Sequence, residues 1–178
     1  MEKQKSNLII KMASSAEFDK IHALNHQIFA KEIPQHPQNA QEILIDSFHE
    51  KNTYFVAMEG EELIGMICYN AIRPFSLDRK LPNLDSWLPF HKKLVEIRLF
   101  AVKPEKRKTG VAIALLKATI VNLINKGYDL GVVSAITREI PMYSSMGGVP
   151  FGALVGTEEA PFQPMYFYIS NLKSLFKP

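Results

Sequence analysis

Apolar residues follow two different spacings in the first thirty positions of the chain. Leu8 to Met12 is a short, mostly apolar run that is typical of a strand. The polar cluster SSAE at positions 14–17 then offers an N-cap for a helix. Apolar residues next recur at helical spacing, at Ile21, Leu24 and Ile28. The chain is therefore predicted to begin with a strand and a helix.

A second helix and a β-hairpin are predicted next. Pro34 and Pro37 interrupt regular structure, and a helix over residues 39–50 would gather three apolar side chains on one face: Ile43, Leu44 and Phe48. Residues 53–72 carry two apolar runs on either side of a charged turn that contains Gly60, which is the pattern of two antiparallel strands.

Residues 73–94 show no regular period. They contain three prolines, the only tryptophan and several other aromatic residues, so we expect an ordered excursion and not a linker. Its large side chains, Phe75, Leu81, Trp87 and Phe90, have two interpretations: they wall an apolar pocket, or they form a small satellite core.

The second half of the chain predicts a β-α-β unit and a shorter ending. The unit consists of a central strand at 95–102, a helix at 111–126 closed by Gly127, and a strand at 130–136. A short helix through residues 141–143 and two strands, around 149–155 and 165–170, follow. The order β-α-α-β-β-β-α-β-α-β-β predicts an α/β fold on a mixed sheet, as a single domain over residues 1–178 with an insertion at about 73–94.

Composition narrows the function classes. The chain has 178 residues, 47% of them apolar, which is enough for one core. Its net charge of +3 is too mild for a nucleic-acid surface, and no stretch is long and apolar enough to span a membrane. Cys68, the only cysteine, excludes an internal disulfide and favours a reducing cytoplasm, where we interpret it as an inert buried thiol. His22 and His26 lack a third metal ligand nearby, so no metal is expected.

The stretch EKRKTGVAIALL, residues 105–116, places three cations, Lys106, Arg107 and Lys108, before a glycine and a predicted helix. The first turn of that helix has no carboxylate to interact with its positive N-terminus. A phosphate would fit this site, although neither common nucleotide-binding glycine motif is present. A basic surface turn that caps the helix is the alternative.

The segment RKTGVA resembles the acyl-CoA pyrophosphate loop of the GNAT acyltransferases, [RQ]-x-x-G-x-[GA], with Arg107, Gly110 and Ala112 at its fixed places. The surrounding LFAVKPEKRKTGVAIALLKA and the element order are also similar to that family. The resemblance implies the GNAT fold and acetyl-CoA or another acyl-CoA as co-substrate. It implies that the donor is bound by the loop and by the strand before it: Phe100, Ala101, Val102, Arg107, Lys108, Thr109, Gly110, Val111 and Ala112.

Two residues are catalytic candidates. Glu96 and Arg98 lie two positions apart in an apolar strand, so they share a face and need partners, water or a cleft. The family often draws a general base from this strand, which makes Glu96 the candidate; a structural ion pair with Arg98 is the alternative. The segment YSSMGG resembles the family's Y-x-x-x-G-F, in which the tyrosine protonates the departing thiolate. This role falls to Tyr143, with a packed core tyrosine as the alternative.

The sequence departs from the family at two places near Tyr143. Gly148 stands where an aromatic residue is usual, and SAITREIPM lacks the usual asparagine. These departures keep open a catalytically silent domain that only binds acyl-CoA.

A fainter resemblance concerns the donor. The segment EIRLFAV and the insertion before it are similar to the related N-acyl amino acid and acyl-homoserine lactone synthases, which take acyl chains from an acyl carrier protein. Basic residues are expected to meet such a carrier or the 3′-phosphate of coenzyme A: Lys92, Lys93, Lys103, Lys106, Arg107 and Lys108. The leading expectation is acyl transfer from coenzyme A to a small-molecule amine, and the alternative is a long-chain synthase. A homodimer is a further expectation, because many proteins of the similar family associate.

Overall fold

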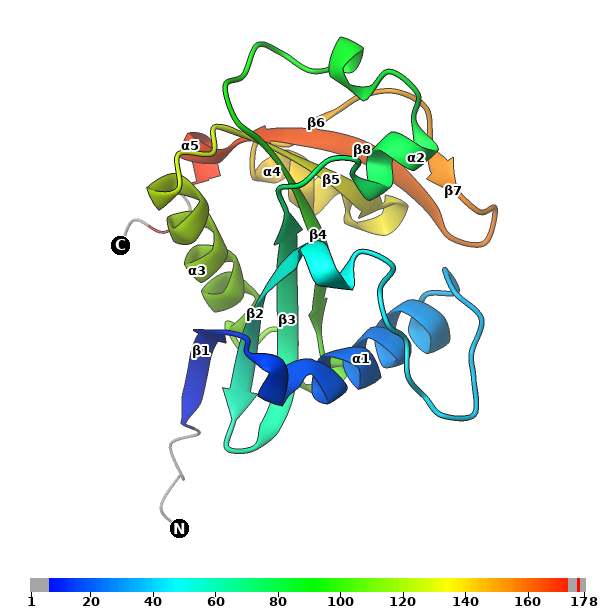
Figure 1. Cartoon of the computed structure of the whole chain (residues 1–178), viewed down its shortest axis with the longest axis vertical. Helices are drawn as coiled ribbons and strands as arrows, with labels where there is room; N and C mark the ends of the chain where they lie inside the picture. Colours follow the sequence, from blue (N-terminus) through cyan, green and yellow to red (C-terminus); the bar gives the residue numbers. More distant parts are fainter. Residues whose placement is uncertain (1–6, 173–175, 177–178) are drawn as a thin grey trace.

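The chain folds around one sheet of eight strands in the computed structural model, which describes residues 7–172 and residue 176 (Figure 1). The strands run in the order β1-β2-β3-β4-β5-β8-β6, and β7 also pairs with β8. Among the strands of the described residues, β4 and β5 alone pair in parallel, so the mixed sheet is confirmed. The strand bounds are β1 Leu8–Met12, β2 Asn52–Glu59, β3 Glu62–Asn70, β4 Leu94–Val102, β5 Leu130–Ile136, β6 Val149–Pro150, β7 Val155–Gly156 and β8 Pro161–Tyr168.

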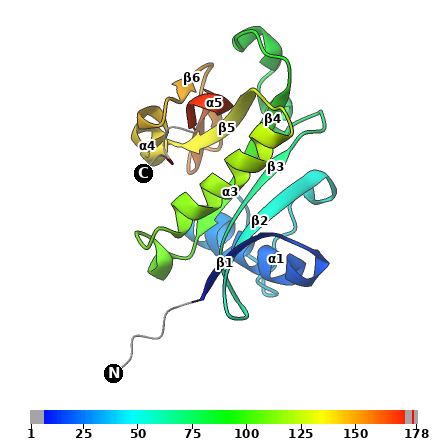
Figure 2. The ribbon, with the colours of Figure 1, turned by 90° about the vertical axis from the view of Figure 1, so that its left-hand side faces the viewer.

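Helices cover both faces of the sheet. The long helix α3 packs on one face and α1 on the other (Figure 2). The alternation along β2 explains this arrangement, because Phe55 and Ala57 face α3 while Tyr54 and Val56 face α1. The helix bounds are α1 Phe18–His26, which continues as a π-helical turn at Gln27–Glu32, α2 Ser76–Lys80, α3 Val111–Asn125, α4 Ile140–Ser145 and α5 Ile169–Leu172. None of the helices in the described ranges is both long and apolar enough to cross a membrane.

The predicted helix over residues 39–50 is wrong. The segment is an irregular loop, and only a 3-10 turn at His49–Lys51 begins near its end. The side chain of Asn39 bonds the backbone of Ile43 instead, with Nδ2 donating to the carbonyl at 2.7 Å. Glu42 adopts a left-handed conformation, with φ of 55°. Local side-chain to backbone bonds of this kind compete with helix formation, and the apolar Ile43 stays exposed.

The insertion at 73–94 contains α2, a 3-10 turn at Leu84–Trp87 and a small core of its own. Phe75 and Leu84 are buried with Val132 and Phe151, and Leu81 packs against them. This confirms the satellite core for Phe75 and Leu81. Both interpretations are wrong for Trp87 and Phe90, which are exposed and belong neither to this core nor to the lining of the cavity described below.

The last strands differ from the two that the pattern predicted after the short helix. The strand expected around 149–155 is divided into β6 and β7, with Gly152 between them at φ +64°. Both pieces pair with β8, which begins at Pro161, before the predicted start near Met165.

Candidate functional site

A bulge in β4 creates the centre of the candidate site. Arg98 lies opposite Cys68 and Ala101 lies opposite Met66, so β4 carries one residue more than β3 over this step. The extra residue is accommodated at Leu99, whose φ is 50°. The bulge reverses the alternation of β4, because Ile97 before it and Phe100 after it both face the core beneath α3.

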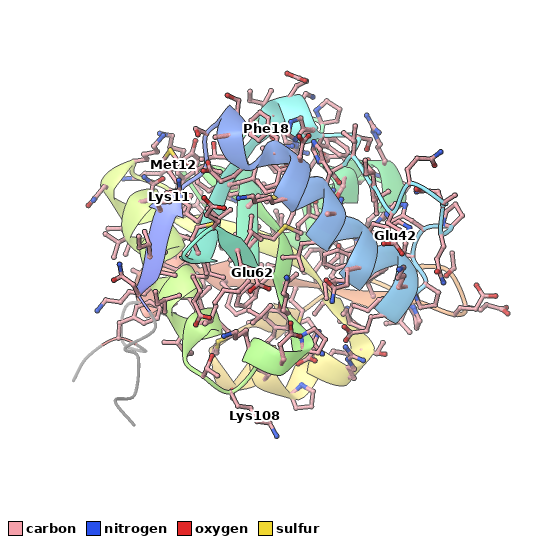
Figure 3. The ribbon with its side chains drawn as sticks, turned by 90° about the horizontal axis from the view of Figure 1, so that it is seen from below. Lys11, Met12, Phe18, Glu42, Glu62 and Lys108 are labelled. Atoms are coloured by element: carbon pink, nitrogen blue, oxygen red, sulfur yellow. The ribbon has the colours of Figure 1, made fainter. Side chains whose placement is uncertain are left out.

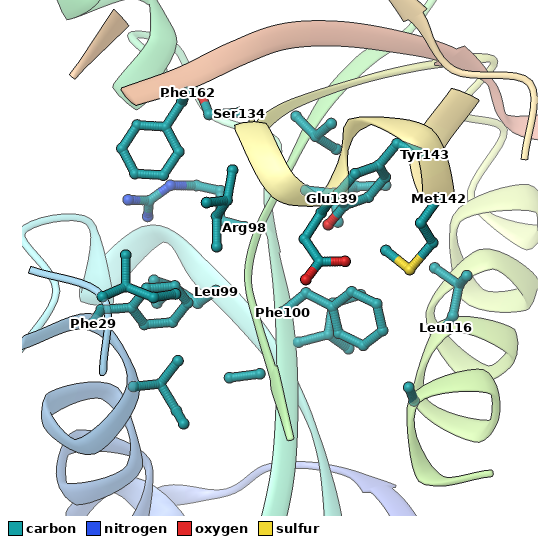
Figure 4. A pocket seen from close by; sticks show the side chains of 18 of the residues that line it. Phe29, Arg98, Leu99, Phe100, Leu116, Ser134, Glu139, Met142, Tyr143 and Phe162 are labelled. Carbon is teal, nitrogen blue, oxygen red and sulfur yellow. The ribbon is translucent and has the colours of Figure 1, made fainter. Parts of the chain in front are cut away.

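A cavity of about 290 Å³ opens where β4 and β5 separate. Their parallel pairing is limited to residues 94–96 of β4 and 130–132 of β5, and β5 and β8 turn away from the first strands (Figure 1). Figure 4 shows β4 crossing the middle of this cavity, with Leu99 on one side and Phe100 on the other. We call the side of Phe29, Arg98 and Phe162 the Arg98 side, and the side of Phe100, Leu116 and Tyr143 the Tyr143 side.

Seven of the eleven predicted site residues line this cavity. They come from β4, from the loop after it, from α3 and from α4: Glu96, Phe100, Ala101, Val102, Arg107, Ala112 and Tyr143. Lys108, Thr109, Gly110 and Val111 do not line it; the first three form the turn into α3, and Val111 is the first residue of that helix. Lys108 points away from the molecule (Figure 3). The cavity therefore joins residues that lie nearly fifty positions apart in the chain.

The turn into α3 leaves the start of that helix open. Gly110 is its N-cap with φ of 88°, and a side chain added there would meet no atom within 4 Å. The first turn of α3 holds no acidic residue. A glycine here supplies the left-handed conformation and lets a ligand approach the backbone N–H groups closely.

Most cations near this turn already have partners. Arg107 forms a two-point ion pair with Glu32, at 2.7 and 2.8 Å, and its Nε donates to the Val102 carbonyl at 3.1 Å. Glu32 also pairs with Arg138 at 3.1 Å. The hydrogen bond from Arg107 is the main cause that lowers the pKa of Glu32. Lys106 pairs with Glu59. Arg107 therefore lies at the cavity already paired with an acidic side chain.

The predicted basic surface is not continuous. Lys92 and Lys93 precede β4, whereas the other four residues, 103 and 106–108, follow it. The nine residues of β4 separate the two groups by roughly 30 Å. One phosphate could not contact both groups.

Glu96 is fully enclosed by donors. Its carboxylate accepts hydrogen bonds from the Ser76 hydroxyl at 2.6 Å and from the N–H groups of Ser76 and Leu77 at 3.0 Å each. The Nε of Arg98 lies 3.4 Å away. Glu96 therefore holds the start of α2 against β4, and the ion pair with Arg98 that the sequence suggested is present.

Arg98 anchors the irregular 39–50 loop. Its two terminal nitrogens donate to both carboxylate oxygens of Asp46, at 2.6 and 2.9 Å. Burial alone would raise the pKa of Asp46, but the hydrogen bonds and charge of Arg98 hold it below its usual range. A buried two-point pair of this kind fixes both partners.

Tyr143 has the environment of a protonated phenol. Its ring packs edge to face on Phe167, with 5.9 Å between centroids, and burial together with the charge of Glu139 raises the pKa of Tyr143 to about 12. A Cβ added at Gly148 would lie 2.7 Å from the ring of Phe167 and 2.8 Å from the Tyr143 carbonyl. Phe167 thus occupies the space that an aromatic residue at position 148 would need.

Several cavity residues escaped the sequence analysis. Ser134 lies on β5, and its buried Oγ has no hydrogen-bond partner among the described residues. A lone hydroxyl within the apolar LGVVSAI is the signal that could have identified it. The insertion contributes only Ser76 and Lys80 to the lining, and both are polar. No group of three or more metal-ligating side chains occurs within residues 7–172 and 176.

Comparison with known proteins shows which family and which solved structures this chain resembles. A sequence profile of the Acetyltransferase (GNAT) family matches residues 18–147. A search of curated proteins found no match.

Among solved structures, the chain is similar to a CoA-dependent acyl-homoserine lactone synthase, BjaI, with a TM-score of 0.78 and 20% identity over 95% of this chain and 88% of that one. It is also similar to FeeM, an N-acyl amino acid synthase from uncultured soil microbes, with a TM-score of 0.73 and 21% identity over 94% of each chain. An N-acetyltransferase from Staphylococcus aureus Mu50 aligns with a TM-score of 0.67 and 20% identity over 92% of this chain and 99% of that one. The predicted fold class is confirmed.

Proposed function

The chain belongs to the Acetyltransferase (GNAT) family and is an acyltransferase, and we propose that it moves an acetyl or other acyl group from coenzyme A directly to a small-molecule amine. We propose one GNAT domain over the whole chain, acting in the cytoplasm, where its single buried thiol, Cys68, would stay reduced. The observation that carries the proposal is the cavity that holds both the bulge of β4 and the side chain of Tyr143.

The donor would lie on the Tyr143 side. Its pyrophosphate would meet the open start of α3 and Arg107, and its pantetheine arm would follow the backbone of Phe100, Ala101 and Val102. A bulge leaves backbone groups of β4 unpaired with β3, and such groups can polarise the thioester carbonyl.

Direct transfer needs an attacking neutral amine and a proton for the departing thiolate. Tyr143, with its pKa near 12, remains protonated at neutral pH and can supply that proton. Glu96 was the candidate base, but its carboxylate is already occupied by Ser76, Leu77 and Arg98. We therefore propose that Glu96 positions Arg98 and α2, and that the amine loses its proton to water.

A specific observation favours the second candidate function, transfer of a longer acyl chain. Beyond Tyr143 the cavity is lined by apolar side chains, which suit a hydrocarbon better than a solvated group: Ile67, Leu116, Val133, Met146, Phe167 and Leu172. Coenzyme A or an acyl carrier protein could present that chain. A silent acyl-CoA-binding domain is the third candidate.

Thermal shift with coenzyme A, acetyl-CoA and a long-chain acyl-CoA separates these candidates. A ligand present at 100 times its Kd stabilises the folded protein by about 2.7 kcal/mol. Absence of any shift would overturn the proposed function. A larger shift with the long-chain donor favours the second candidate. Binding of an acyl-CoA without release of its thiol in the presence of any acceptor favours the silent domain.

A further inference from the structure

Lys80 brings a charge from the insertion to the cavity. It is the last residue of α2, and it lines the cavity together with Ser76 of the same helix. Its Nζ lies 5.3 Å from the centroid of the Phe162 ring, which places it on the Arg98 side. The insertion therefore adds a lysine, and no aromatic wall, to this side.

Lys80 has no hydrogen bond or ion pair to any described residue. The charged groups around it are already satisfied, because Asp46 is held by Arg98 and Glu96 is held by α2 and Arg98. Loss of surrounding water lowers the pKa of Lys80, and the charge of Arg98 adds to this effect, against Glu96 and Asp46. Lys80 is exposed and lines the cavity without a counter-ion, so an arriving anion can form a charge-assisted hydrogen bond with its ammonium group.

A second polar group lies unpaired on this side. Ser134 precedes Ile136 by two positions on β5, and Ile136 lies opposite Phe162 of β8, so Ser134 shares their face (Figure 4). Its Oγ is buried and lacks a partner among the described residues. A ligand on the Arg98 side would thus meet a cation and a free hydroxyl.

This cation is remote from the phosphates of the donor. Lys80 is close to Glu96 and Arg98, whereas the turn into α3 follows Val102. The six positions from 96 to 102 span roughly 20 Å of strand, with the bulge between them. The anion that Lys80 attracts therefore belongs to the other substrate.

Resting on the proposed function, we propose that the acceptor amine carries a carboxylate and that Lys80 binds this carboxylate. The carboxylate beside Lys80 would leave the amine of the acceptor free to reach the carbonyl held near the bulge. Lys80 is then a specificity-determining residue for the acceptor.

Matched acceptors test the proposal. Release of the coenzyme A thiol is followed with a panel of the common amino acids and, for each, its carboxamide, in the wild-type protein and in Lys80→Met, which preserves side-chain length. The free acids should be preferred by the wild type. Lys80→Met should raise the KM for them by roughly 10-fold or more and leave the KM for the donor unchanged, because a charged hydrogen bond is lost. Lys80→Arg should retain much of the preference.

Lys117→Met is the control, since Lys117 is exposed on α3. Equal use of acids and carboxamides, or an unchanged preference in Lys80→Met, would overturn the carboxylate assignment while acyl transfer itself still stands. Absence of thiol release with every acceptor, together with no thermal shift by any acyl-CoA, would overturn the proposed function and this inference with it.

Discussion

Arg107 and Glu32 face each other across the candidate site in a two-point ion pair, with distances of 2.8 and 2.7 Å. Glu32 ends the π-helical turn after α1, and Arg107 lies just before the open start of α3. An incoming pyrophosphate would have to share Arg107 with Glu32 or displace the Glu32 carboxylate from the guanidinium group. This relationship makes the effect of Glu32 on donor binding measurable.

We expect Glu32→Gln to tighten coenzyme A binding by about 1.4- to 5-fold, because an exposed ion pair of this kind is worth about 0.2–1 kcal/mol and the competing charge is removed. Arg107→Ala should weaken the same binding. Isothermal titration calorimetry with coenzyme A measures both. Weaker binding by Glu32→Gln would show instead that Glu32 holds Arg107 in its binding position.

Tyr143→Phe should lower kcat by about 100-fold, because removal of a general acid costs that order of rate. Its affinity for coenzyme A should stay near the wild-type value, since the ring still packs on Phe167. The comparison uses Tyr166→Phe, whose ring packs against Phe151 outside the cavity lining. Retention of full kcat in Tyr143→Phe would remove the assignment of general acid.

Glu96→Gln should destabilise the fold by about 1.5–3 kcal/mol, because a buried charged acceptor of three hydrogen bonds is lost. Urea denaturation followed by circular dichroism measures this change. An unchanged free energy of unfolding would contradict the structural role. If Glu96 also served as the base, the variant would in addition lose the acidic limb of the pH profile of kcat.

The depressed pKa of the Glu17 carboxylate predicts how the stability of the fold depends on pH. Hydrogen bonds from Lys11 and then from the amide and hydroxyl of Ser14 lower the pKa of Glu17 from 4.5 to about 2. A carboxylate with a depressed folded-state pKa stabilises the protein above its unfolded pKa, and this contribution disappears as pH falls from 4.5 towards 2. The difference in Tm between wild type and Glu17→Gln should therefore be constant above about pH 5 and shrink in acid. A difference that stays constant down to pH 2 would contradict this.

Local patterns predicted most elements because each depends on neighbouring residues. The strand predicted at 130–136 is observed at Leu130–Ile136, and the helix predicted at 111–126 is α3. The 39–50 segment failed this approach because side-chain bonds fix its conformation. Asn39 bonds to Ile43 nearby, and Asp46 binds a distant partner, Arg98, 52 positions later in the chain. Apolar spacing alone carries no information about such a pair.

Some features of the candidate site could likewise be predicted from the sequence, and others could not. The glycine turn before α3, the apolar central strand and the tyrosine after β5 were recognisable in the sequence, because each is a short local pattern with its own chemistry. Only the tertiary structure decided which charges are free. It engaged Glu96 with α2, paired Arg107 with Glu32 and left Lys80 without a counter-ion. These outcomes depend on packing between segments far apart in the chain, and spacing along the sequence does not encode them.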